Sequence, residues 1–277
     1  MIQYENPSID NILNKGKKEF TFMSYGGGVQ TFGMLLMIKE GLIPKPDYAV
    51  FSDTHAEKDL TYEHIQNVAI PIFNEIGLPF FIVDKEGGLI NGYKRLNSIP
   101  TVFMRSCTKN YKIRPIDYFA RNIAGLKPHQ RAYPGLVANA LIGISTDEKQ
   151  RSQQKYGSYK WIKMKYPFIE LDYSRRQIID YIESKGYEVP VKSGCWLCPF
   201  QSLKNWAELK LSDRAKFDEA VEMEEAYFIK FPHMKMGFTN QMGIRLKTLQ
   251  EMPTLYEFVE TLPNDERTCG SSSSCFI

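Results

Sequence analysis

A run of three glycines after a short apolar segment constrains the fold more than any other feature of the chain. Residues 20–23 are mostly apolar and predict a buried β-strand, and Gly26, Gly27 and Gly28 follow closely. A helical pattern of apolar residues then begins at Thr31. Glycine lets the main chain approach an anion closely, and the N–H groups and dipole of a helix N-terminus attract negative charge. This order of elements predicts a phosphate-binding loop, and the alternative is a glycine-rich turn without a ligand.

Two common phosphate-binding motifs do not fit this loop. A Walker A loop carries Lys-Ser or Lys-Thr after its glycines, whereas this chain continues with Val29 and Gln30. A dinucleotide-binding fingerprint carries a third glycine three residues further on, where this chain has Thr31. The phosphate compound therefore has to be inferred from other parts of the chain.

Apolar runs alternate with helical patterns over the first two-thirds of the chain. Residues 48–52, 79–83 and 138–145 predict further strands. Residues 60–76 predict a helix capped by Asp59, and residues 177–185 predict a helix that Ser174 begins and Gly186 ends. The alternation predicts an α/β fold with a doubly wound, mainly parallel sheet. Ligands of such sheets gather at the carboxyl ends of the strands, where the glycines and Asp53 fall.

The character of the sequence changes after Gly186. A Cys-x-x-Cys motif and a charged helical stretch at residues 203–231 come next, and the segment from Pro263 onward is polar and rich in serine. We therefore expect a nucleotide-binding α/β domain at residues 1–186. A helical C-terminal part with the Cys-x-x-Cys motif is expected at residues 187–262, and a flexible cysteine-containing tail at residues 263–277.

The composition bears on the compartment and the partners that we expect for the protein. The chain has 277 residues and a net charge of +3, which neither requires nor excludes a nucleic-acid partner. No apolar run approaches the roughly 20 residues of a membrane helix, and the first 18 residues lack the apolar core of a signal peptide. A cytoplasmic protein without a membrane partner is expected. Five cysteines in a reducing compartment then indicate ligands or reactive thiols rather than disulfides.

Five segments resemble one protein family, in the order in which that family carries them. Residues 27–31 resemble the Ser-Gly-Gly-x-x-Ser/Thr loop of the PP-loop ATP pyrophosphatases. The other four resemble segments of the phosphoadenosine phosphosulfate (PAPS/APS) reductase branch of that superfamily. Among its members, the segments are most similar to those of the DndC-like subgroup. Residues 50–57 resemble its Asp-Thr-Gly-x-Glu segment, and residues 106–115 resemble its Cys-x-x-x-x-Lys-x-x-Pro segment. Residues 143–151 resemble its Gly-x-Arg-x-x-Glu…Arg element, and residues 166–172 resemble its Pro-Leu-x-x-Trp segment.

The resemblance implies an adenine-nucleotide alpha-hydrolase-like fold that binds ATP or PAPS/APS together with Mg²⁺. Main-chain donors near Gly27 would hold phosphates, and Asp53 would hold Mg²⁺ or a ribose hydroxyl; a turn cap is the alternative for Asp53. Gln30 stands where many members of the family carry an aspartate. The residues implied in nucleotide binding are Ser24, Gly26, Gly27, Gly28, Gln30, Thr31, Asp53, Lys109 and Gly143.

The resemblance also implies two catalytic cations. Lys112 and Arg151 would neutralise the negative charge that builds up on a leaving pyrophosphate or sulfate. A solvated helix face is the alternative for Lys109 and Lys112.

The spacing of Cys195 and Cys198 is typical of metal ligands or of a redox pair, and its late position in the chain favours a metal. The resemblance places Cys107 beside the nucleotide site and implies that it is the third ligand. Three thiolates can hold a [4Fe-4S] cluster with one open iron, whereas structural zinc takes four ligands. Zinc is the alternative, with a fourth ligand from Cys269, Cys275 or His233.

Three functions are compatible with these features. In the first, ATP-dependent sulfur transfer, the enzyme adenylates an acceptor and then inserts sulfur, which an open iron or a persulfide supplies. In the second, the protein is a PAPS/APS reductase that produces sulfite, with Cys269 as the attacking thiol in a segment resembling the Glu-Cys-Gly of those reductases. In the third, it is a non-catalytic zinc-knuckle protein that binds nucleotides or nucleic acid.

The expected partners follow from these functions. An adenine nucleotide is the partner in the first two, and a nucleotide or a nucleic acid is the partner in the third. The acceptor for sulfur transfer would be DNA or tRNA, and a cysteine desulfurase would donate the sulfur. Thioredoxin or glutathione would serve the reductase, and the sequence leaves a homodimer open.

Overall fold

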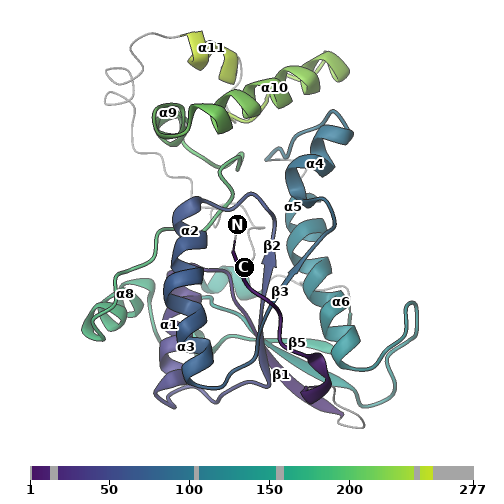
Figure 1. The fold of residues 1–277 in the computed structure, drawn as a ribbon, viewed down its shortest axis with the longest axis vertical. Helices are drawn as coiled ribbons and strands as arrows, with labels where there is room; N and C mark the ends of the chain where they lie inside the picture. Colours follow the sequence, from purple (N-terminus) through teal and green to yellow (C-terminus); the bar gives the residue numbers. More distant parts are fainter. Residues whose placement is uncertain (1, 13–17, 103–105, 154–158, 240–243, 252–277) are drawn as a thin grey trace. The chain divides into compact units, whose positions relative to one another are not determined.

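The computed structural model describes residues 2–12, 18–102, 106–153, 159–239 and 244–251 (Figure 1). These residues form two compact units. The first unit contains residues up to 85 together with residues 110–194. The second contains residues 86–109 and the described residues from Cys195 onward. The predicted boundary near residue 186 stays a prediction, and the predicted tail lies outside the described residues.

The first unit is built on a five-stranded sheet in the order β3-β2-β1-β4-β5. Every pair of neighbouring strands is parallel, so the predicted α/β class is confirmed. β1 lies between β2 and β4, and the chain order reverses at the step from β1 to β4. This step is the topological switch point, where parallel sheets of this kind bind ligands. The strands are β1 (Glu19–Ser24), β2 (Tyr48–Asp53), β3 (Phe80–Asp84), β4 (Val137–Leu141) and β5 (Ile162–Lys165).

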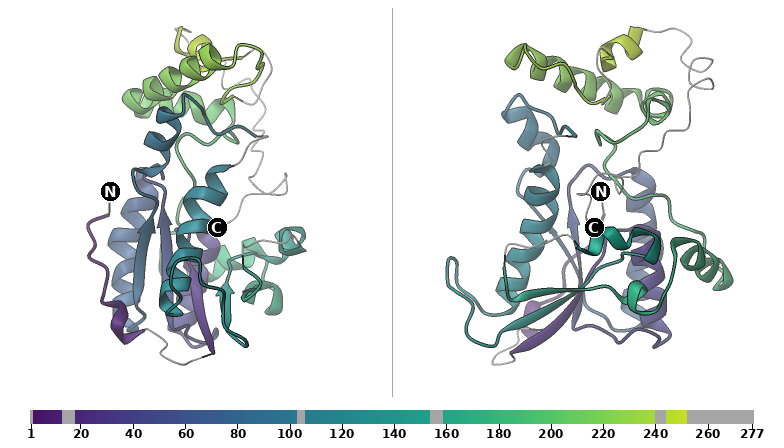
Figure 2. Two further views of the ribbon diagram at one scale, coloured as in Figure 1. Left: turned by 90° about the vertical axis from the view of Figure 1, so that its right-hand side faces the viewer. Right: turned by 180° about the vertical axis from the view of Figure 1, so that it is seen from behind.

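Helices cover both faces of this sheet (Figures 1 and 2). On one face, α1 and α8 pack closely, since a Cβ on Gly33 would lie 2.5 Å from Cγ2 of Ile178. The core there joins Met23, Ala49 and Phe51 of the sheet to the helices. The elements of this face are α1 (Val29–Lys39), α2 (Asp59–His64), the π-helical turn η2 (Ile65–Ala69), α3 (Ile70–Glu75) and α8 (Arg175–Ser184).

The opposite face is covered mainly by α6 (Arg114–Ile123). Its core joins Phe22, Val50 and Ala140 of the sheet to Ile116 and Ala120 of the helix, and Figure 1 shows α6 across the sheet from α1, α2 and α3. α6 continues the helical segments α5 (Ser106–Thr108) and η3 (Lys109–Ile113). Three short helices complete the described part of this unit: η1 (Ile9–Asn11), η4 (Thr146–Gln153) and α7 (Pro167–Glu170).

Several predicted boundaries need correction. The first helix begins at Val29, two residues before the predicted start. Asp59 is the first residue of α2 and Lys58 is its N-cap, so the predicted cap at Asp59 is wrong. β4 ends at Leu141, and the rest of the apolar run at 138–145 forms a loop in which Gly143 packs against the first turn of α1. Ser174 is confirmed as the N-cap of α8, where it forms a capping box with Gln177.

The second unit is helical in its described residues. The predicted stretch at 203–231 is two helices, because Asp213 interrupts it and caps the second by accepting the N–H of Lys216 at 3.1 Å. None of the helices in the described ranges is both long and apolar enough to cross a membrane. The helices are α4 (Gly88–Arg95), α5, α9 (Leu203–Ser212), α10 (Arg214–Lys230) and α11 (Leu246–Glu251).

A buried carboxylate on α10 holds the chain that follows this helix. Glu224 is 1% exposed, and its two oxygens accept the main-chain N–H groups of Phe238 and Leu246 at 2.8 and 2.7 Å. Gly237 is required beside it, since a Cβ there would lie 2.1 Å from Oε1 of Glu224. Burial raises the pKa of Glu224 to about 7, against the opposing effect of the two N–H groups and of Arg245.

This shift predicts a stability that depends on pH. The native state keeps a proton on Glu224 that the unfolded chain releases near its ordinary pKa of 4.5, so stability is lost as the pH rises through about 7. We expect the stability advantage of the wild type over Glu224→Gln to shrink by up to about 3 kcal/mol between pH 5 and 8. Urea unfolding of both proteins across this range measures it. An advantage that stays constant would contradict the assignment.

Candidate nucleotide site

The glycine loop (residues 25–28) lies at the carboxyl end of β1 and leads directly into α1. Gly28 is the N-cap of α1, and no side chain among the described residues caps this helix. The Thr31 hydroxyl donates to the Gly28 carbonyl at 3.1 Å and accepts the Gly26 N–H at 3.3 Å, which fixes the shape of the loop. The N-terminal amides and the dipole of an eleven-residue helix therefore place partial positive charge at the switch point.

Residues from α2 and from the segment before the Cys-x-x-Cys motif pack closely against this loop. Gly27 has a φ of +70°, and a Cβ there would lie 2.9 Å from Cγ2 of Thr61. A Cβ on Gly28 would lie 2.6 Å from the Ser193 hydroxyl. Ser193 was not among the predicted site residues; its only signal is a Ser-Gly pair directly before the Cys-x-x-Cys motif. The glycines are thus required for packing as well as for access to an anion, so a bulky residue at Gly27 would disturb α2 whether or not a phosphate binds.

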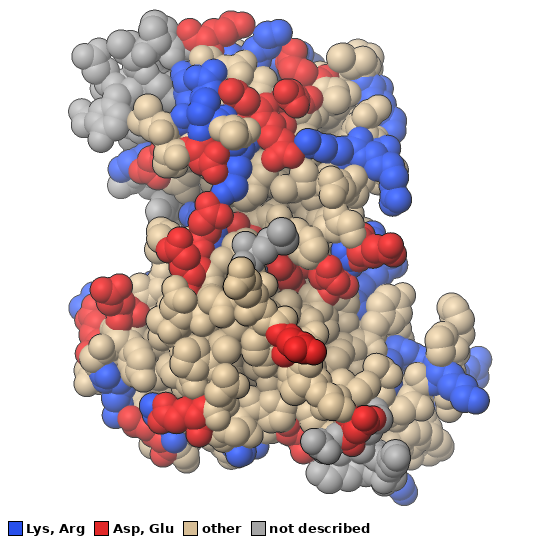
Figure 3. All heavy atoms as spheres, in the orientation of Figure 1, with Lys and Arg blue, Asp and Glu red and all other residues tan. Residues whose placement is uncertain are grey.

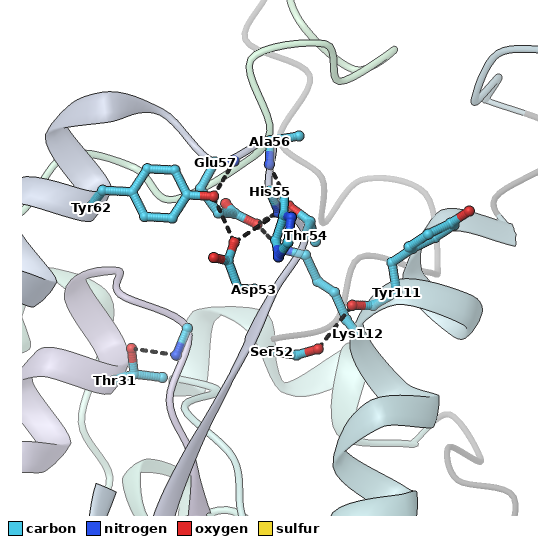
Figure 4. Close-up of polar contacts among 11 residues, drawn as sticks. Thr31, Ser52, Asp53, Thr54, His55, Ala56, Glu57, Tyr62, Tyr111 and Lys112 are labelled. Atoms are coloured by element: carbon cyan, nitrogen blue, oxygen red, sulfur yellow. Dashed lines mark hydrogen bonds and ion pairs between the residues drawn. The ribbon is translucent and has the colours of Figure 1, made fainter. Parts of the chain in front are cut away.

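Asp53 is held in place at the carboxyl end of β2 (Figure 4). Its Oδ1 accepts the Tyr62 hydroxyl at 2.6 Å and the His55 N–H at 2.8 Å. Burial and the Asp53 charge raise the pKa of the Tyr62 hydroxyl, which stays a proton donor. His55 has a φ of 58° and its Nε2 lies 2.9 Å from Asp84, so the histidine belongs to the loop rather than to the centre of the site.

Lys112 forms an ion pair with a fully buried carboxylate at the same edge of the sheet (Figure 4). Its Nζ lies 2.9 Å from Oε1 of Glu57, and the Thr54 hydroxyl donates to the same oxygen at 3.1 Å. The Ser52 hydroxyl also donates to the Tyr111 carbonyl at 2.8 Å, which joins η3 to the end of β2. Lys112 therefore does not belong to a solvated helix face.

A third group joins the glycine loop to the segment after β4. Oε2 of Glu148 accepts from Nε2 of Gln30 at 3.1 Å, and Oε1 accepts from Arg151 at 2.7 Å. Gly143 packs on the first turn of α1, where an added Cβ would lie 3.2 Å from the Thr31 nitrogen. The predicted residues that lie in the first unit are Ser24, Gly26, Gly27, Gly28, Gln30, Thr31, Asp53, Lys112, Gly143 and Arg151.

The other predicted residues in the described ranges belong to the second unit. Lys109 belongs to the second unit, and its nucleotide contact stays a prediction. Cys107, Cys195 and Cys198 are half-buried and also belong to that unit. The Cys198 N–H donates to the Cys195 carbonyl at 3.1 Å, which closes a tight turn.

The thiols suit a soft metal, but their assembly into a metal site stays a prediction. Within the described ranges, no group of three or more His, Cys, Asp or Glu side chains is placed to hold a metal ion. Cys269 and Cys275 lie outside the described residues.

Comparison with known proteins adds little about this site. No protein-family model and no curated protein matches the chain. Among solved structures, the U34-tRNA thiolase NcsA from Methanococcus maripaludis with its [4Fe-4S] cluster is similar at 13% identity. The match covers 97% of this chain and 83% of that chain, with a TM-score of 0.44.

The Lys112–Glu57 pair yields a prediction about stability. Lys112→Met would leave the Glu57 carboxylate buried without its ion-pair cation, and we expect a loss of about 3 kcal/mol in the free energy of unfolding. The double variant Glu57→Gln/Lys112→Met should recover part of this loss, because no buried charge remains. Denaturant unfolding measures both.

The matched control for this prediction is Lys39→Met, which removes an exposed ion pair with Glu75. The control should cost less than about 1 kcal/mol. Equal, small losses at Lys39 and Lys112 would contradict the buried pair.

Proposed function

We propose that this protein is an adenine-nucleotide-dependent enzyme of the PP-loop type that uses ATP to activate an acceptor for sulfur transfer. One observation carries the proposal. The uncapped N-terminus of α1 lies at the switch point, and the ends of the strands on either side of β1 lead to two cations that carboxylates hold in place. Such an arrangement suits a polyphosphate and the charge that develops on it during reaction.

In this proposal each side chain has a defined task. The loop amides bind the phosphates, and Ser193 adds a hydroxyl beside Gly28. Lys112 and Arg151 offset the charge that builds on the leaving pyrophosphate, and their carboxylate partners keep them positioned before the substrate arrives. Mg²⁺ would be held by Asp53, since carboxylate oxygens suit this cation and Tyr62 orients the group.

The proposed reaction has two steps. An acceptor oxygen forms a bond to the α-phosphorus of ATP while the bond to the β-phosphate breaks and pyrophosphate leaves. A sulfur nucleophile at the oxidation level of sulfide then forms a bond to the activated carbon while the carbon–oxygen bond breaks and AMP leaves. Adenylation is needed because it converts a poor leaving group into a good one.

The sulfur in this proposal is handled by the second unit. Cys195 follows Ser193 by two residues in the chain, and Cys107 lies in the same unit. A [4Fe-4S] cluster on Cys107, Cys195 and Cys198 would supply an open iron that binds sulfur. The acceptor proposed is a nucleic acid, DNA or tRNA. On the face in Figure 3, basic and acidic side chains are interspersed over α9 and α10, so charge alone does not select that acceptor.

Arg151 provides a test of nucleotide binding. We expect Arg151→Ala to weaken ATP binding by about 10- to 100-fold, because it removes a charged donor to phosphate. The matched control is Arg176→Ala, an exposed arginine paired with Asp180, which should change nothing. Calorimetric titration measures both. If ATP binds equally to all three proteins, the phosphates have been assigned to the wrong place.

The reaction product separates the functions. Release of pyrophosphate from ATP when an acceptor is present would support sulfur transfer. Release of sulfite from PAPS or APS would instead show that the protein is a reductase. Neither product, with ATP still bound, would favour a non-catalytic binding protein.

The cluster is tested by anaerobic purification with metal analysis. We expect brown protein with about four irons per chain, and loss of iron from Cys195→Ser and Cys198→Ser alike. Asp213→Asn in the same unit is a control that leaves the thiols intact. Colourless, zinc-loaded protein after anaerobic reconstitution would remove the cluster from the proposal.

A further inference from the structure

A pocket opens on the α6 side of the sheet, next to the switch point. It encloses about 500 Å³ including its open mouth. Ser24, Ile142 and Ile144 line it at and beyond the ends of β1 and β4, and Ile113 and Asp117 line it from the opposite wall. The remaining lining residues are Phe22, Ile116, Ala140, Ile162, Met164 and Tyr166.

Two buried polar groups interrupt this apolar lining. The Ser24 side chain belongs to a residue that is 2% exposed, and its hydroxyl has no hydrogen-bond partner among the described residues. A buried hydroxyl is normally satisfied, so its position in a pocket wall points to a ligand. Asp117, which is 4% exposed, brings a carboxylate to the same pocket from the first turns of α6.

We propose that this pocket holds the purine base of the nucleotide, and that Asp117 selects adenine by accepting a hydrogen bond from its 6-amino group. The inference rests on the proposed function, because the glycine loop must hold the phosphates of the same nucleotide. Ser24 precedes the first glycine by two residues, so loop and pocket share one edge of the sheet. A nucleotide that crosses this edge places its phosphates over α1 and its base under α6.

The chemistry of the lining favours a base over other parts of the nucleotide. None of the described residues that line the pocket is Lys or Arg, which makes it unsuited to a phosphate. A ribose presents several hydroxyls and would leave most of them against isoleucine side chains. A base has two apolar faces and few polar edge groups, which matches an apolar pocket with two polar contacts.

The carboxylate gives the pocket a preference that can be measured. An ionised carboxylate only accepts hydrogen bonds, so it pairs with the 6-amino group of adenine, whereas hypoxanthine has a carbonyl at that position and its nearest donor, N1–H, lies one ring position away. ATP should therefore bind more tightly than ITP by about tenfold or more. In Asp117→Asn the amide can donate or accept, so the preference for ATP should fall at least about fivefold, mainly through better ITP binding.

The experiment titrates ATP and ITP into wild-type protein, Asp117→Asn and the control Asp180→Asn, whose carboxylate is exposed on α8. The control should keep the wild-type ratio. An unchanged ratio in Asp117→Asn, with ATP still bound, would overturn the assignment of Asp117 and leave the proposed function standing. Failure of the wild type to bind either nucleotide would instead overturn the proposed function.

Photo-cross-linking of the wild type with 2-azido-ATP keeps the pocket testable if Asp117→Asn does not fold. Label on peptides that contain Met164 and Tyr166, or Ile113 and Asp117, is the expected result. Label that maps only to peptides without pocket residues would overturn the inference.

Discussion

The site depends on the close approach of the loop after β4 to the first turn of α1. Gly143 leaves no room for a side chain between them, because an added Cβ would lie 3.0 to 3.2 Å from atoms of Gln30 and Thr31. This contact brings Glu148 within hydrogen-bonding distance of Gln30, and Glu148 in turn holds Arg151. A cation is thereby fixed beside the glycine loop by residues from two segments that are far apart in the sequence. The lack of a side chain at Gly143 thus helps to determine where the positive charge of Arg151 lies.

The electrostatics follow a common pattern at the strands on either side of β1. After β2, the buried Glu57 holds Lys112, and after β4, Glu148 holds Arg151. A carboxylate partner lowers the net charge of the empty site, which limits repulsion between the cations and the helix dipole. It also fixes each side chain, so less conformational entropy is lost when an anion binds. Gln30 fits this pattern because its side-chain amide donates to the Glu148 carboxylate, which comes from another segment.

Local sequence patterns were sufficient for the central strands and for the glycine loop. β1, β2 and β3 are rich in buried apolar residues, and the Ser174 capping box is a local signal for the start of α8. The edge strand β5 was not predicted, because Ile-Lys-Met-Lys is short and alternates polar with apolar residues as exposed edges do. The Asp213 break was missed because charged residues continue on both sides of it. The contacts of Lys112 with Glu57 and of Ser193 with Gly28 join distant parts of the chain, and only the folded structure brings them together.

The central claim is that main-chain amides of the glycine loop bind the phosphates of an adenine nucleotide. A crystal structure of the protein with a non-hydrolysable ATP analogue tests it most directly. The claim predicts phosphate oxygens within about 3 Å of the N–H groups at the start of α1. An ordered analogue bound elsewhere, with the glycine loop in contact only with protein and solvent, would contradict it.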